Sequence, residues 1–182
     1  MKHDLRSVAD KLLAVSRTAL KKTGSAPLLV AFGYENAMVE LLLLPEVFSL
    51  ALDQGRTKDL LFGGLRVLAE QKKATLVAIS TESWMARSTP AADAIPQEEF
   101  RRLAGLNDGF ETLISMGLVE RVEAIMVTVQ DADEVLVLTQ AFSRRMDGTP
   151  FGLKEPEEMR MPQSCYGGRT KMFGEINEET IR

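Results

Sequence analysis

The residues best suited to chemistry follow one apolar run, in the stretch TLVAISTESWMAR at positions 75–87. If this stretch is a regular strand, Ser80, Glu82 and Trp84 share one face, because successive side chains alternate. Glu82 is the candidate catalytic residue, since a carboxylate there could act as a general base or bind a metal. Ser80, Trp84 and Arg87 are candidate ligand-binding residues. Trp84 could stack on a ring, and Arg87 could pair with Glu82 or with an anionic ligand.

A structural role fits the same residues. Trp84 would then cap the core, and Glu82 would accept hydrogen bonds from loop backbone or form a salt bridge. Carboxylates in special environments also occur in purely structural networks, and for this reason we favour the structural interpretation. The sequence leaves open whether Glu82 faces an opening or is held by the fold beneath Trp84.

The histidine and cysteine content excludes several kinds of active site. His3 is the only histidine and lies near the start of the chain, which argues against a Ser-His-Asp or Cys-His relay. Cys165 is the only cysteine, so no disulfide can form within the chain and no zinc site can be built from these two residue types. We expect no metal site of this kind and no bound cofactor.

Composition predicts an ordinary globular protein. The chain has 182 residues, 45% hydrophobic and 26% charged, with a formal net charge of -4. This length favours a single domain, and the negative charge argues against nucleic acid as a partner. No apolar run is long enough to span a membrane, and the charged N-terminal segment does not resemble a secretory signal. A cytoplasmic location is therefore expected.

Hydrophobic periodicity predicts a chain of mixed helices and strands. The segment 37–44 is ambiguous, because its composition favours a helix while the short turn before it and Pro45 after it favour a strand; we favour the strand. A strand, a helix and a strand in succession suggest a crossover between neighbouring parallel strands. The predicted helices lie at about 4–22, 57–72, 97–103 and 110–116, and the predicted strands at 28–32, 37–44, 75–82, 122–129 and 134–142, with a loop at 86–96.

One short motif carries a resemblance. The run from Lys58 to Trp84, a helix leading into LVAISTESW, resembles a group of uncharacterised small bacterial proteins in which a strand ends in Ser/Thr-Glu-Ala-Trp. The hairpin at 121–145, which ends in an arginine after its second strand, is similar as well. Ser83 replaces the alanine of the motif, and residues 86–118 are longer than that group leads us to expect. The resemblance implies a fold and no activity.

Together these patterns predict one α+β domain over residues 1–143, with a mixed, mostly antiparallel sheet of about five strands and helices packed on it. Residues 144–182 are predicted to form an extended C-terminal arm or tail that is partly docked. The favoured function is a non-enzymatic binding or interaction protein that forms a homodimer. The alternative is a carboxylate-based hydrolase or transferase, with or without magnesium, acting on a small or phosphorylated ligand near Glu82.

Overall fold

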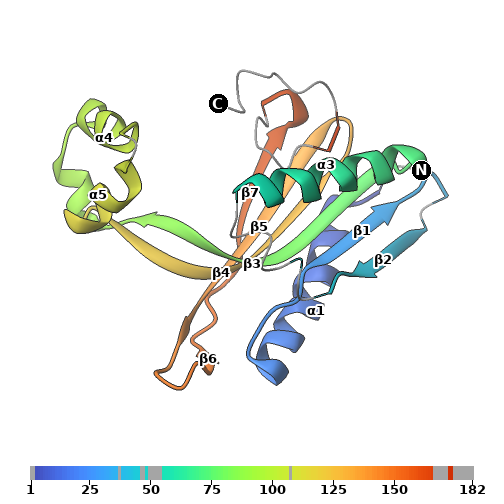
Figure 1. Ribbon diagram of the computed structural model, residues 1–182, viewed down its shortest axis with the longest axis horizontal. Coiled ribbons are helices and arrows are strands. Elements are labelled where there is room, and N and C mark those ends of the chain that lie inside the picture. Colours follow the sequence, from blue (N-terminus) through green and yellow to red (C-terminus); the bar gives the residue numbers. More distant parts are fainter. Residues whose placement is uncertain are drawn as a thin grey trace.

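The chain folds into an α+β structure, as predicted (Figure 1). The computed structural model describes residues 3–36, 38–45, 48, 55–106, 108–165 and 172–173. The helices are α1 (Leu5–Thr23), α3 (Gly55–Gln71), α4 (Gln97–Ala104) and α5 (Gly109–Ser115), with short 3-10 turns at Pro90–Ala94 and Gln163–Cys165. The strands are β1 (Leu29–Gly33), β2 (Val39–Leu43), β3 (Leu76–Ser88), β4 (Val119–Gln130), β5 (Glu134–Arg144), β6 (Pro150–Phe151) and β7 (Glu157–Pro162).

The sheet is antiparallel at every described pairing. Its strand order is β2-β1-β3-β4-β5-β6, and β7 also pairs with β5. The ambiguous segment after the first hairpin turn is a strand, as favoured, because Val39–Leu43 pairs along its whole length with β1. The sheet has seven strands where the sequence suggested about five. The two additional strands, β6 and β7, lie in the segment that the sequence assigned to an arm, and both lie against β5.

The predicted crossover between neighbouring parallel strands is wrong. β2 and β3 are parallel to each other, but β1 lies between them and pairs antiparallel with both. Burial gives the physical reason: all five residues of β1 are buried, whereas β2 alternates exposed and half-buried residues. A strand that is apolar on both faces belongs inside the sheet, and a strand with one apolar face can stand at its edge.

Two helices cover opposite faces of the sheet. α1 packs on the face that carries Ala78, Val127 and Leu138, which we call the α1 face, and α3 packs on the face that carries Phe32 and Val77. α1 ends as predicted, with Gly24 as its C-cap at a positive φ of 82°. Leu5, Val8, Leu12, Val15 and Ala19 recur at helical spacing, which predicts one buried face. The buried face of α1 is rotated from this stripe, because Val15 is 44% exposed while Ser16 and Leu20 are buried.

β3 and β4 extend beyond the body of the sheet as a two-stranded ribbon that carries α4 and α5 (Figure 1). We call residues 89–118 the head. The head has its own apolar cluster, with Leu103 and Leu113 buried at its centre. The predicted loop at 86–96 begins late, since residues 86–88 still pair with β4. The sequence pattern missed this extension because a two-stranded ribbon buries neither face completely.

Glu40 of β2 joins the first hairpin to the C-terminal end of α3. Its Oε2 atom accepts hydrogen bonds from Tyr34 Oη at 2.6 Å and from Lys72 Nζ at 2.8 Å. The hydrogen bond from Lys72, and then that from Tyr34, lower the pKa of Glu40 below its ordinary value of 4.5. These contacts fix the side chain of the one charged residue in β2 on the α3 side of the sheet.

We expect Lys72→Met to raise the pKa of Glu40 measured by NMR titration of its carboxyl carbon. Because the pKa of Glu40 is lower in the folded state, its contribution to stability is present above the pKa of the unfolded chain and is lost as pH falls through the folded value. The variant should therefore lose less stability on acidification than the parent. An unchanged titration midpoint would contradict the hydrogen bond between Lys72 and Glu40. Lys73→Met, at the neighbouring exposed position, is the control.

Candidate functional site

The carboxylate of Glu82 is held by the fold on both of its oxygen atoms. Oε2 accepts hydrogen bonds from the backbone N–H of Ala26 at 3.0 Å and from Ser25 Oγ at 3.4 Å, both in the linker between α1 and β1. Oε1 accepts a hydrogen bond from the guanidinium of Arg144, at the end of β5. About a quarter of the Glu82 side chain is exposed. The carboxylate thus connects three segments that are far apart in the sequence.

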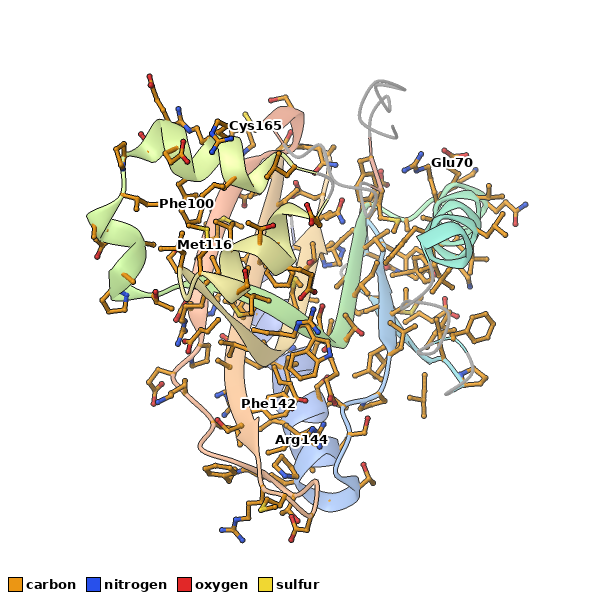
Figure 2. The ribbon with its side chains drawn as sticks, turned by 60° about the vertical axis from the view of Figure 1, so that its left-hand side comes forward. Glu70, Phe100, Met116, Phe142, Arg144 and Cys165 are labelled. Atoms are coloured by element: carbon orange, nitrogen blue, oxygen red, sulfur yellow. The ribbon has the colours of Figure 1, made fainter. Side chains whose placement is uncertain are left out.

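Arg144 is the centre of this cluster. Its guanidinium donates to the backbone carbonyls of Gly24, at the C-cap of α1, and of Gly148, in the turn after β5. Its Nε lies 2.8 Å from Oε2 of Glu123, which forms an ion pair with it from β4. The guanidinium also lies 5.2 Å from the ring centre of Phe142. Figure 2 shows Phe142 and Arg144 at the same end of β5, close to α1.

We call Glu82, Glu123 and Arg144 the arginine cluster. Two carboxylates surround one guanidinium, and the arginine side chain is only 23% exposed. Three donors of the fold, from Ser25, Ala26 and Arg144, already bind the carboxylate of Glu82. This arrangement is suited to tying the end of α1 to β3, β4 and β5, which is a structural task.

The four residues selected from the sequence do not converge on one site. Ser80 is completely buried and shares a hydrogen bond of 2.7 Å with Ser16 of α1. Glu82 and Trp84 follow Ser80 on the α1 face, as predicted from alternation. Arg87 is one of the odd-numbered residues on the opposite face and donates a hydrogen bond of 2.6 Å to Glu157 of β7.

The expectation that Trp84 caps the core is wrong. Trp84 is 56% exposed and lies where the ribbon begins, opposite Glu123, the last residue of β4 that pairs with β5. Its ring lies 5.8 Å from the guanidinium of Arg121, which also lies 5.5 Å from the ring of Phe110 in α5. Arg121 in turn donates to Glu111 at 2.8 Å. Through Arg121, Trp84 is therefore connected to α5 of the head.

Sequence reasoning missed Arg144 and Glu123. Arg144 and its neighbour Arg145 suggest a solvated pair at a strand end, and the separation of 62 residues conceals the contact with Glu82. A signal for Glu123 does exist, because it interrupts the apolar residues on one face of β4. In the β3–β4 register Glu82 pairs with Ile125, which places Glu123 two residues further along on the same face.

Compared with protein-family models, curated proteins and solved structures, the chain gives no match. Within the ranges that the structure describes, no group of three or more His, Cys, Asp or Glu side chains is placed to hold a metal ion. Across the same residues, no helix has the length and apolar character needed to cross a lipid bilayer. A function must therefore be argued from the fold and the surfaces that it exposes.

Proposed function

We propose that the protein is a non-enzymatic interaction protein that associates with itself. This proposal rests on one observation, the exposed apolar surface of the edge strand β2. Its side chains on the α1 face are all apolar and exposed: Val39 by 42%, Leu41 by 48% and Leu43 by 67%. Among the described residues no strand pairs with the outer edge of β2. Natural edge strands are usually protected by charges, bulges or covering elements. On this face β2 has no charged residue, and no element in the described ranges pairs with its outer edge.

One apolar residue of α1, Val15, is also exposed. Arg6 and Arg17 extend from one flank of the helix toward β7 and β5, where they bond to Glu158 and Gln140. Residues advance by about 100° along a helix, so Val15 lies on the opposite flank, which faces β1 and β2. Val15 is 44% exposed. The exposed apolar row of β2 is of the kind that marks an interaction site.

The alternative function, a hydrolase or transferase near Glu82, has less support. It requires a carboxylate that is free to take a proton or bind a metal, and both oxygens of Glu82 are engaged within the fold.

Two further expectations from the sequence accompany the proposal of an interaction protein. We place the protein in the cytoplasm because its lone cysteine, Cys165, is exposed and unpaired. We also propose that the chain is related to the small bacterial proteins in which a strand ends in Ser/Thr-Glu-Ala-Trp.

Light scattering coupled to size exclusion tests the proposal. The chain has a mass of 20.1 kDa, so a dimer should appear at twice this mass as the concentration rises. A mass of 20.1 kDa at every concentration would contradict self-association.

A thermal-shift screen against magnesium, nucleotides and metabolites tests the alternative, an enzyme that acts near Glu82. A ligand-induced rise in melting temperature that Glu82→Gln abolishes would favour the enzyme.

A further inference from the structure

We infer that β2 pairs with the β2 strand of a second copy, antiparallel about a two-fold axis at Leu41, so that two chains share one continuous sheet. This inference rests on the proposed self-association and names the surface and register that produce it. It follows from three features of β2: the direction of its backbone groups, the order of its side chains, and the absence of unpaired charge.

Hydrogen bonds at the two ends of the β1–β2 hairpin show which way the backbone groups of β2 point. Tyr34 N donates to Met38 O at 3.0 Å, and Leu44 N donates to Leu28 O at 3.1 Å. Residues of an antiparallel strand alternate between pointing their N–H and C=O groups toward one neighbour and toward the other. The even-numbered residues of β2 therefore bond to β1. The N–H and C=O groups of Val39, Leu41 and Leu43 point outward to the free edge.

The register of the proposed pairing decides which residues of the second copy these outward-pointing groups meet. With a two-fold axis at Leu41, Leu41 faces the partner's Leu41, and Val39 faces the partner's Leu43. Each facing pair exchanges two main-chain hydrogen bonds, because the residues on both strands are those with outward-pointing groups. All five residues of β2 are used, whereas an axis at a neighbouring residue leaves part of the strand unpaired. A two-fold interface of this type uses the same surface on both chains.

The side chains agree with this register. An axis perpendicular to the sheet keeps the two α1 faces on the same side, so the apolar rows of the two strands meet and become one strip. Facing apolar pairs on neighbouring strands stabilise a sheet. The free edge of β2 thus offers a second copy of β2 both main-chain hydrogen-bonding groups and an apolar row of side chains.

Charge does not oppose the pairing. Glu40 is the only charged residue of β2, and it lies on the opposite face, bonded to Lys72 at 2.8 Å and to Tyr34 at 2.6 Å. Two copies would therefore bring no unpaired like charges together at the axis. A strand from an unrelated protein could use the same backbone groups, but it would not reproduce the symmetric match of Val39 with Leu43 across Leu41.

The test introduces charge at the axis. We expect Leu41→Lys alone and Leu41→Glu alone each to weaken dimerisation about 100-fold or more, because like charges then face each other across the axis. An equimolar mixture of the two variants should restore dimers, since lysine then faces glutamate. Leu60→Lys is the matched control: Leu60 is 72% exposed on α3, and its replacement should leave the dissociation constant unchanged. The measurement is analytical ultracentrifugation under reducing conditions, which keep Cys165 unpaired.

The outcomes separate this inference from the broader proposal. If the parent chain is monomeric at every concentration, self-association itself is overturned. If Leu41→Lys remains as dimeric as the parent, or if both variants are monomeric and their mixture stays monomeric, the chain associates but not in this register. Circular dichroism checks that each variant is folded. Should Leu41→Lys fail that check, Leu43→Lys takes its place. Leu43 is 67% exposed and faces the partner's Val39, so a folded Leu43→Lys variant that still dimerises as the parent does would overturn the inference.

Discussion

Replacing Arg144 by methionine should lower the free energy of unfolding by about 2–3 kcal/mol, the range for losing charged hydrogen bonds in a partly buried ion cluster. The substitution keeps most of the aliphatic volume and removes every donor. It would leave the carbonyls of Gly24 and Gly148 without their side-chain partner. It would also leave Glu82 and Glu123 close together with no positive charge between them. Urea denaturation at a fixed protein concentration measures the effect.

The matched control is Arg145→Met at the next residue. Arg145 is exposed, and its guanidinium lies 5.8 Å from the ring of Phe151 at the rim of the sheet. Its replacement should cost less than about 0.5 kcal/mol, as surface substitutions usually do. Equal effects at the two positions would show that the arginine cluster is not the structural centre described above.

The second large effect is expected in the head. Leu113→Ala removes a buried side chain from the small cluster that holds α4 against α5, at a cost of about 2–4 kcal/mol for a leucine in a packed core. Because this cluster lies apart from the two clusters of the body, the loss should be local. We expect hydrogen exchange to become fast across α4 and α5 and to stay slow in β1 and in the body end of β4.

Leu106→Ala is the control for the head, since Leu106 is 44% exposed. It should change exchange in α4 and α5 little. Loss of protection throughout the sheet in Leu113→Ala would mean that the head and the body unfold as one unit. That result would contradict the description of the head as a separately packed element on a ribbon.

Much of the fold could be predicted because it depends on local patterns. The 3.6-residue periodicity and Gly24 located α1 within one residue at each end. Alternation located the hairpin of β4 and β5, whose turn residues separate two apolar strands. Pro45 and the short preceding turn favoured a strand for β2. These features are set by neighbours in sequence, so one sequence is sufficient to predict them.

The features that were missed depend on contacts between distant segments. β3 adds to the free edge of β1, and no pattern in either strand states that the pairing is antiparallel. The contact between Glu82 and Arg144 joins the third and fifth strands, so it becomes visible only when the register of β3, β4 and β5 is known. The exposure of Trp84 follows from the ribbon, whose length is set by pairing and not by its apolar content.

The central claim is that the free edge of β2 is an interface between two copies of the chain. Amide hydrogen exchange of β2, measured by NMR at low and high protein concentration, tests it most directly. We predict that the amides of Val39, Leu41 and Leu43 exchange freely in dilute protein and become protected as concentration rises, while those of Glu40 and Leu42 stay protected throughout by β1. If the three outward amides exchange equally fast at both concentrations, the edge is not the interface.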